Sequence, residues 1–360
     1  MKSSTTISSP RRLKAAALVG SGVAGMSRLR NVHEVSILAW HGVCQGMGDE
    51  QVLDWSLHMP QDIFRRVCAF LASNYNVISL RELVCCLEAG EKPHPNAVVL
   101  TFDDGYASNF HLAWPVIREF NLPATIFVTT GFLDGVEKLW FQRLDLALGR
   151  TKQDHLKWNL EHGPEVLPLG KRDQRRAALD HLLREFKKLP DADLLGEIDR
   201  LEHALGVSEP DTDDLPAPMR PMTWDQARTM VSGGLVEIGG HTHTHPILSR
   251  CDPATQRAEI FTCRDRITAE LGTPPLTFCY PNGGPADYTS ETVSLLKEAG
   301  FRAACTMENG RVESSVPLFE LPRYGSPESV WEAEATVSGA FETVKEWRQM
   351  ARNHLFGFFA

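Results

Sequence analysis

The stretch Ala97-Val98-Val99-Leu100-Thr101-Phe102-Asp103-Asp104-Gly105 decides the fold class of this 360-residue chain. Its first six residues are a continuous run of mostly apolar and β-branched side chains, which is typical of a strand buried on both faces of a parallel sheet. Two aspartates and a glycine follow at once, so we expect the strand to end in a sharp turn. This places two carboxylates at the carboxyl end of a buried strand.

Short strand-like runs alternate with helical patterns on both sides of this stretch, which indicates parallel βα units. Residues 62–73 have apolar side chains at helical spacing, and Ser79 with Glu82 resembles a capping box that opens the next helix. We therefore expect an α/β protein with a parallel sheet. The expected strands are residues 35–40, 75–80, 97–102, 124–129, 235–238, 276–280, 303–306 and 318–321.

The βα rhythm is interrupted between Gly131 and Pro221, where the sequence is charged and helical in pattern. We expect an inserted helical subdomain, closed by the acidic, proline-rich stretch 208–221. Loops at the carboxyl ends of parallel strands commonly shape substrate access, so the insertion is expected to form a wall or lid over the site. A merely solvated helical face is the alternative interpretation.

Residues 1–34 form a separate N-terminal segment in which basic side chains flank a short run of small apolar residues, 15–26. That run is too short to span a bilayer. A surface helix is favoured over a secretory signal peptide because no A-x-A cleavage site follows, and contact of this basic segment with an anionic membrane is a further interpretation. A barrel over residues 35–330 and a helical tail over 331–360 complete the expected organisation.

Composition excludes several classes of protein. With 42% hydrophobic and 23% charged residues the chain is neither disordered nor a small disulfide scaffold. Lys and Arg total 37 against 46 Asp and Glu, and the resulting net charge of −9 opposes binding to nucleic-acid phosphates. The eight cysteines show no C-x-x-C pair, as expected for thiols kept reduced inside a cell. We expect a cytoplasmic or membrane-peripheral protein, with a periplasmic or secreted one as the alternative.

A second polar cluster, His241-Thr242-His243-Thr244-His245-Pro246, follows another expected strand. One aspartate oxygen and two imidazoles form a suitable ligand set for a divalent metal such as Zn²⁺. Asp103 and Asp104 can share a pocket only if the chain turns there, which Gly105 allows, and one carboxylate can then bind metal while the other acts as a base. Taken alone, each cluster is also compatible with an ordinary polar turn.

The two clusters, in this order and each after a strand, resemble the first two motifs of the polysaccharide deacetylase family, carbohydrate esterase family four, which contains the chitooligosaccharide deacetylase homology domain. T-F-D-D-G is matched by residues 101–105, and H-[ST]-x-x-H-P is matched by 241–246. The resemblance extends over about residues 35–325. It implies a distorted (β/α)7 barrel.

The resemblance also implies roles for individual residues. Asp103 would be the general base, and the metal ligands would be Asp104, His241 and His245. His243 is then left for a supporting or surface position. Trp40-His41 looks like the family's Tyr-His pair after the opening strand, so His41 is expected to line the site, with a histidine bonded to backbone at a strand end as the alternative.

The third motif departs from the pattern of other members. Phe278-Cys279-Tyr280-Pro281-Asn282-Gly283 looks like its F-x-Y-P-x-G version, and Tyr280, Pro281 and Asn282 are therefore expected to contact substrate. The arginine with which other members orient the base is absent from this segment. Arg323 is the candidate replacement, and a surface arginine is the alternative.

The usual general acid, a histidine in a late L-x-H motif, has no counterpart, because His354 is the only histidine after His245. Either Asp103 returns the proton to the leaving amine, or His41 or another group supplies it.

As a whole, the resemblance implies metal-assisted hydrolysis of N-acetyl groups on a hexosamine-containing polysaccharide or lipid-linked glycan. An O-acetyl esterase is an alternative, because the same site would attack an ester more easily. A sugar-binding barrel without turnover is another, because the acid histidine and the motif arginine are missing. The enzyme is favoured since a binding module has no need for a base beside a metal.

Overall fold

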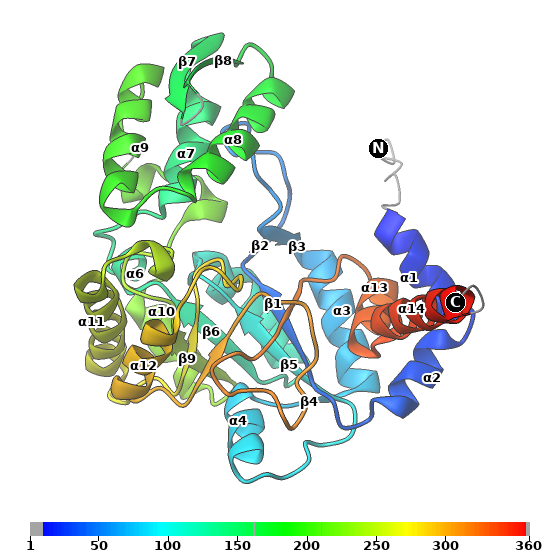
Figure 1. The fold of residues 1–360 in the computed structure, drawn as a ribbon. Helices are drawn as coiled ribbons and strands as arrows, with labels where there is room; N and C mark the ends of the chain where they lie inside the picture. The colour runs from blue at the N-terminus through cyan, green and yellow to red at the C-terminus, as the bar shows by residue number, and fades with distance from the viewer. Residues whose placement is uncertain (1–9, 161–162, 210, 358–360) are drawn as a thin grey trace.

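Seven parallel strands form the centre of the molecule, in the order β11-β10-β9-β6-β5-β1-β12, and a short eighth strand pairs with β5 outside this path (Figure 1). The computed structural model describes residues 10–160, 163–209 and 211–357. β1 and β5 are buried along their whole length, as expected for strands covered on both faces. The strands of this sheet are β1 (Ser36–Trp40), β4 (Asn76–Val77), β5 (Ala97–Phe102), β6 (Ala124–Val128), β9 (Val236–Gly240), β10 (Thr277–Cys279), β11 (Ala303–Cys305) and β12 (Tyr324–Gly325).

The two edges of the sheet meet at one short segment, residues 321–325. Tyr324 of β12 pairs with Leu38 of β1, and Leu321 makes a parallel bridge to Cys305 of β11. The segment therefore joins both edges and gives the expected distorted (β/α)7 barrel. The expected last strand, 318–321, lies along β11 but makes only one β-bridge, at Leu321, and the last strand of the sheet is residues 324–325.

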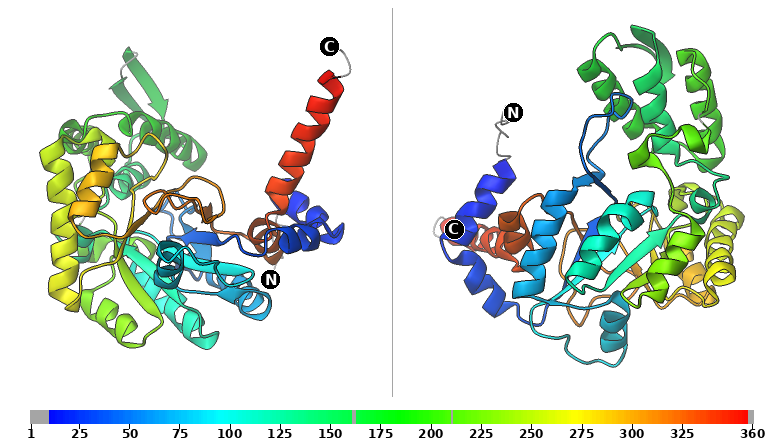
Figure 2. Two further views of the ribbon diagram at one scale, coloured as in Figure 1. Left: turned by 60° about the horizontal axis from the view of Figure 1, so that its bottom comes forward. Right: turned by 180° about the vertical axis from the view of Figure 1, so that it is seen from behind.

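Helices cover the outside of the barrel, as the two further views in Figure 2 show. The start of α4 confirms the expected cap, since the Ser79 hydroxyl accepts a hydrogen bond from the Glu82 backbone N–H at 3.0 Å. The covering helices are α3 (Gln61–Asn74), α4 (Leu80–Glu88), α5 (Trp114–Glu119), α10 (Trp224–Ser232), α11 (Pro253–Leu271) and α12 (Ser290–Glu298).

The insertion rises above the barrel as a separate layer with its own hydrophobic core (green in Figure 1). Helix α6 (Thr130–Leu133), which comes just before this layer in the chain, still packs in the barrel core. The layer itself also contains a β-hairpin, which the sequence does not predict. Side chains of the second hairpin strand alternate between less and more exposed, which is a strand period rather than a helical one. The other elements are α7 (Trp140–Arg150), β7 (His155–Leu160), β8 (Gly163–Pro168), α8 (Arg172–Phe186) and α9 (Asp191–Leu205).

A loop between β2 (Gly42–Cys44) and β3 (His58–Pro60) ties the insertion to the barrel. The Asp145 carboxylate on α7 accepts hydrogen bonds from the backbone N–H groups of Leu53 at 2.7 Å and Asp54 at 3.0 Å. Arg176 on α8 pairs with the Asp54 carboxylate at 2.6 Å. The insertion is therefore fixed to the loop that follows β2.

Both ends of the described chain pack against each other beside the barrel. They form α1 (Pro10–Gly20), α2 (Val23–Arg30), α13 (Val330–Val337) and α14 (Ala340–Gly357). A small core of mainly alanines joins them, and the Ser27 hydroxyl donates to the Thr343 hydroxyl at 2.9 Å. Among the helices of the described chain, none has the length and apolar composition needed to cross a membrane.

Candidate active site

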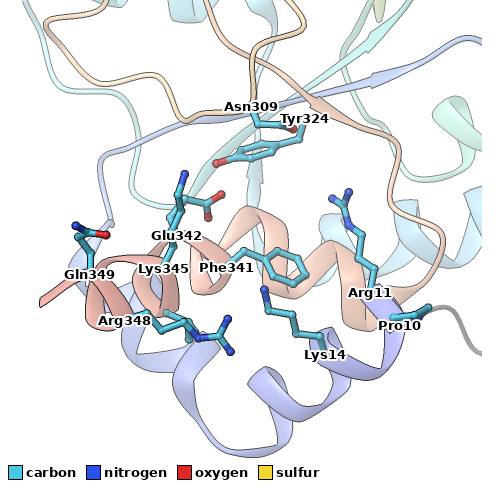
Figure 3. A pocket seen from close by; sticks show the side chains of 11 residues that line it. Pro10, Arg11, Lys14, Asn309, Tyr324, Phe341, Glu342, Lys345, Arg348 and Gln349 are labelled. Atoms are coloured by element: carbon cyan, nitrogen blue, oxygen red, sulfur yellow. The ribbon is translucent and has the colours of Figure 1, made fainter. Parts of the chain in front are cut away.

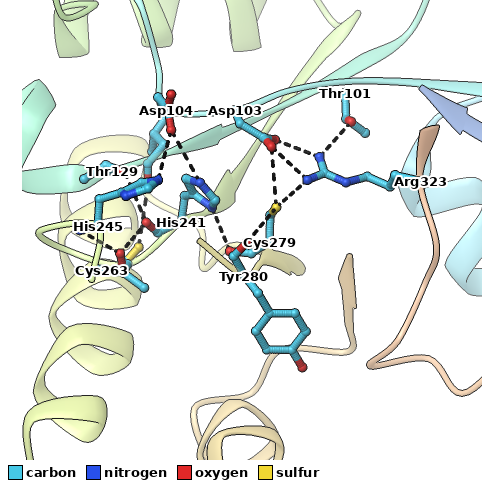
Figure 4. A network of polar contacts seen from close by, with 12 residues as sticks. Thr101, Asp103, Asp104, Thr129, His241, His245, Cys263, Cys279, Tyr280 and Arg323 are labelled. Carbon is cyan, nitrogen blue, oxygen red and sulfur yellow. Dashed lines mark hydrogen bonds and ion pairs between the residues drawn. The ribbon is translucent and has the colours of Figure 1, made fainter. Parts of the chain in front are cut away.

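Polar side chains converge at the carboxyl ends of the barrel strands (Figure 4). Asp103 and Asp104 follow β5, His241 follows β9, and Arg323 immediately precedes β12. Since carboxyl ends of parallel strands lie on one side of the barrel, residues far apart in sequence share one pocket.

The chain turns sharply directly after β5. The backbone N–H of Asp103 donates to the Trp40 carbonyl at 2.8 Å, which extends the pairing of β5 with β1 by one residue. Asp104 then adopts a left-handed conformation with φ 72°, followed by Gly105 with φ 88°. The reversal thus begins at Asp104 itself, one residue before the expected Gly105, and it brings both carboxylates into the pocket.

Two further residues of the site are left-handed, Thr242 and His245, both with φ 67°. Such conformations cost roughly 1–3 kcal/mol each for non-glycine residues and concentrate at functional sites. Hydrogen bonds hold this loop: the Thr242 hydroxyl accepts from the His245 backbone N–H at 3.0 Å. The buried Glu259 accepts from the backbone N–H groups of His243 and Thr244, both at 2.8 Å.

Asp104 lies between two imidazoles. Its Oδ1 atom is 3.4 Å from Nε2 of His241 and 3.4 Å from Nε2 of His245, and all three side chains are buried. Within the described residues, neither carboxylate oxygen of Asp104 has a hydrogen-bond partner. Burial alone would raise the pKa of Asp104, but the adjacent imidazoles hold it well below its ordinary value. A buried carboxylate in this state requires a positive partner.

Both imidazoles point their Nε2 atoms toward Asp104. Nδ1 of His241 lies 2.7 Å from the Cys279 carbonyl, which can only accept, so Nδ1 carries the hydrogen and Nε2 is free to bind a metal. Burial lowers the pKa of His245, which favours its neutral form. One carboxylate and two imidazoles that meet in a buried space fit a divalent cation such as Zn²⁺.

Asp103 is held by Arg323 rather than by the imidazoles. Two parallel bonds join them, from Nη1 to Oδ1 at 2.7 Å and from Nη2 to Oδ2 at 2.8 Å. Arg323 is completely buried, and its Nε donates to the Thr306 carbonyl at 2.9 Å. Burial alone would raise the pKa of Asp103, but the charge and hydrogen bonds of Arg323 lower it. The structure thus places Arg323 where the sequence analysis needs an arginine; the catalytic roles of both residues stay predictions.

Cys279 links the two halves of the site, and the sequence analysis misses it. Its thiol is 3.7 Å from Oδ2 of Asp103 and 2.8 Å from Nη2 of Arg323. Burial and the nearby Asp103 charge raise the pKa of this thiol well above its usual range, so it stays neutral. Asp103, His241 and Cys279 also lie close enough to form a ligand set, but the Arg323 cation beside two of them disfavours a metal there.

Tyr280 points away from Asp104 and the two imidazoles (Figure 4), and its expected contact with substrate stays a prediction. Its ring is buried, stacks on Tyr288 with centroids 4.1 Å apart, and its hydroxyl donates to the Phe319 carbonyl at 3.0 Å. The reason is the alternation of side chains after β10: Cys279 points into the barrel, so Tyr280 points away from it (Figure 4). Pro281 is buried, and Asn282 has φ 58° and a buried side-chain nitrogen without a partner among the described residues; their contacts with substrate stay predictions.

His41 and His243 lie outside the metal set. His41 follows β1 and contributes to the lowered pKa of both Asp103 and Asp104, so its ring is close to the pocket. Its backbone carbonyl accepts from the Asn109 side chain at 2.7 Å. Nδ1 of His243 lies 2.9 Å from the Thr130 hydroxyl of α6.

The insertion contributes a side chain to the wall of the site. The Phe141 ring on α7 meets the His245 ring edge-to-face, with centroids 5.2 Å apart. The neighbouring residue, Gln142, is also buried, and its side-chain amide donates to the Met219 carbonyl at 3.3 Å. Helical periodicity alone gives no signal for such contacts, because they depend on how the insertion docks.

A model of the polysaccharide deacetylase family matches residues 90–154 and 196–304 of this chain. The chain belongs to the polysaccharide deacetylase family. The unmatched residues between these segments belong to the insertion and include the β-hairpin and α8. YxkH of Bacillus subtilis, named as a polysaccharide deacetylase, is 31% identical over 96 residues, which cover 26% of this chain and 32% of that relative.

Solved structures of deacetylases share the fold of this family member. Streptococcus pyogenes deacetylase PplD, solved with acetate, aligns with a TM-score of 0.57 and 17% identity over 85% of this chain and 99% of that one. IcaB from Ammonifex degensii aligns with a TM-score of 0.52 and 16% identity over 85% and 97% of the two chains. The deacetylase domain of Bordetella bronchiseptica BpsB aligns with a TM-score of 0.50 and 18% identity over 81% of this chain and 96% of that one. The match supports a seven-stranded α/β barrel as the architecture.

Proposed function

We propose that this protein hydrolyses the N-acetyl groups of a hexosamine-containing polysaccharide or lipid-linked glycan. The observation that carries the proposal is the buried Asp104 carboxylate, which lies between two imidazoles without a hydrogen-bond partner among the described residues, beside an Asp103 held by Arg323. A sugar-binding barrel would have no use for this second carboxylate.

Asp104, His241 and His245 would hold the metal. When bound there, a divalent ion such as Zn²⁺ would polarise the acetyl carbonyl and lower the pKa of water. Asp103 would accept the proton of the attacking water, because the two bonds from Arg323 fix its carboxylate in one orientation. Cys279 would add a neutral contact to the same carboxylate without changing its charge.

Asp103 can also complete the reaction. A carboxyl group with a lowered pKa is a strong acid once protonated, so Asp103 would readily give its proton to the leaving amine. His41 is the second candidate for this step, because its ring is close to both carboxylates. Comparison of His41→Ala with wild type would distinguish the two: little change in kcat assigns the step to Asp103.

Acetate release tests the proposal directly. Wild-type protein should release acetate from N-acetylglucosamine oligomers after loading with zinc, and it should lose this activity after chelation. Asp103→Asn should keep the metal and the fold but lose about a hundredfold or more in kcat, since an amide does not accept the water proton. Release from O-acetylated xylan alone would identify an esterase, and release from neither would favour a binding protein.

The insertion would form part of the wall over this site. Phe141 already contacts His245, and Asp145 fixes the loop that follows β2. A bulky glycan would then approach along the insertion before it reaches the metal ligands.

The terminal helices are our candidate for contact with a membrane surface, which would make the location membrane-peripheral. Of the ten large hydrophobic side chains exposed in the described chain, six lie on these helices. Residues 10–30 carry five basic side chains and no acidic one, although several arginines pair with nearby glutamates. A cavity of about 770 Å³ between α1 and α14 is also lined by Lys14, Lys345 and Arg348 (Figure 3). Apolar and basic groups together favour an anionic lipid surface.

Sedimentation with lipid vesicles tests this contact. Wild type should sediment with vesicles that contain phosphatidylglycerol, less so in high salt, and not with pure phosphatidylcholine. Leu29→Glu, at an 81% exposed position, should weaken the binding, whereas Leu195→Glu on α9 should not. Equal binding of both variants to the vesicles would show that the terminal helices do not form the membrane contact.

A further inference from the structure

A second cavity, of about 830 Å³, extends between the loop after β2, helix α3 and the start of α13. Ligand cavities in proteins typically enclose roughly 300–1,000 Å³. This one is therefore large for a single sugar unit. It is separate from the cavity between α1 and α14, which shares none of its lining residues.

The inner end of this cavity adjoins the proposed catalytic centre. His58 lines it, and the His58 ring meets the Tyr106 ring edge-to-face with centroids 5.3 Å apart. Tyr106 is the second residue after Asp104 in the chain. Ser326, three residues after Arg323, lines the same cavity. The cavity therefore lies beside the turn that carries the proposed metal ligand Asp104 and the proposed base Asp103.

Two tryptophans line the cavity, and they suit a sugar chain. Trp55 is half-buried, whereas Trp331, the second residue of α13, is 53% exposed. A flat indole face offers apolar area at a low cost in side-chain entropy, and a pyranose ring presents C–H groups that pack on such a face. Trp331 is thus an accessible platform at the outer part of the cavity.

Charged groups that line the same cavity supply partners for hydroxyl groups. Asp62 and Arg66 pair at 2.9 Å with side chains that are 73% and 65% exposed, so both keep free hydrogen-bonding capacity toward solvent. Arg12, which pairs with Glu328 at 2.9 Å, lines the cavity as well. A lining that combines aromatic faces with carboxylate and guanidinium groups matches the apolar and hydroxyl faces of a glycan better than it matches an apolar peptide or a lipid chain.

We infer that this cavity binds the sugar units next to the one whose acetyl group is removed, so that the protein acts within an extended glycan rather than on a single amino sugar. The inference rests on the proposed function. It names Trp331 as a residue that determines the preferred length of the substrate.

Substrate-length dependence tests the inference. For wild type, kcat/KM should be higher for a six-unit N-acetylglucosamine oligomer than for the two-unit one. Trp331→Ala should lower the ratio of these two values about tenfold, and Trp331→Phe should restore most of it because an aromatic face remains. Trp347→Ala is the matched control, since this tryptophan is 41% exposed on α14 and does not line the cavity. A wild-type ratio in Trp331→Ala would overturn the inference.

A binding measurement separates this inference from the proposed function. In an Asp103→Asn background, titration with the six-unit oligomer followed by calorimetry should give a Kd that rises about tenfold on Trp331→Ala and is unchanged on Trp347→Ala. Binding with this dependence but no hydrolysis by wild type would defeat the proposed function and leave the cavity assigned. Hydrolysis by wild type, with no effect of Trp331→Ala on Kd or on the ratio of the two kcat/KM values, would support the proposed function and overturn the assignment of the cavity.

Discussion

Replacement of Arg323 by methionine should damage both stability and turnover, for one reason. The variant leaves the Asp103 carboxylate, which is 2% exposed, without its cation. Removal of one partner from a buried ion pair typically costs about 3–5 kcal/mol, because the other charge stays buried and unpaired. The Thr306 carbonyl also loses a donor, which adds to the cost. Since domains of ordinary stability unfold with about 5–15 kcal/mol, we expect a folded but weakened protein.

Urea unfolding, metal analysis and acetate release together check this prediction. Arg323→Met should keep its metal, because no metal ligand changes, but should lose about a hundredfold in kcat as the base loses its fixed orientation. The double variant Asp103→Asn/Arg323→Met should regain part of the lost stability, since the stranded charge is gone. Arg143→Met is the matched control: this buried arginine forms a similar two-bond pair with Glu202, at 3.0 and 2.6 Å, inside the insertion.

The control should lose stability but keep kcat on a two-unit substrate. If Arg323→Met turned over at the wild-type rate, Arg323 would not position the base. If both arginine variants lost turnover equally, the effect would be general destabilisation and the reasoning from the site would fail.

Three further outcomes are expected. His241→Ala should abolish stoichiometric zinc measured by mass spectrometry, and a full equivalent with normal activity would place the metal elsewhere. Phe141→Ala should change kcat/KM for polymer more than for a two-unit substrate, whereas equal effects on both would leave Phe141 as a support of His245 only. Burial raises the pKa of Asp145 to about 6 from 3.8, so the folded state favours its protonated form. The unfolding free energy of wild type should therefore fall relative to Asp145→Asn as pH rises from about 4 to 6, and a constant difference in urea titrations would contradict this.

Strands and the polar residues that follow them could be predicted where consecutive residues of the sequence carry the pattern. The run 97–102 coincides with β5, since a continuous apolar run with a following Asp-Asp-Gly leaves little choice of register. Arg323 could be proposed because its apolar neighbours indicate burial. Its two bonds to Asp103 could not, because they depend on closure of the barrel over a separation of 220 residues.

Other features required the three-dimensional structure. Side-chain alternation along the short strand β10 would have placed Cys279 inside the barrel and Tyr280 outside, but three residues are too few for a visible period. Phe141 lies in a helix whose pattern shows only that one face is buried, not which histidine that face meets. The hairpin in the insertion could not be predicted, because each of its strands has only six residues within an otherwise helical region.

The strand that joins the barrel edges, β12, has only two residues, yet the residue before it holds the base. Short pairings with few backbone hydrogen bonds open at a lower free energy than long ones. Gentle warming should therefore loosen this joint first, while β5 and β9 still keep Asp104 and His241 together. Heat inactivation would therefore begin with a reversible opening between β12 and β1. In that state the metal ligands would still lie together, and the rest of the barrel would still be folded.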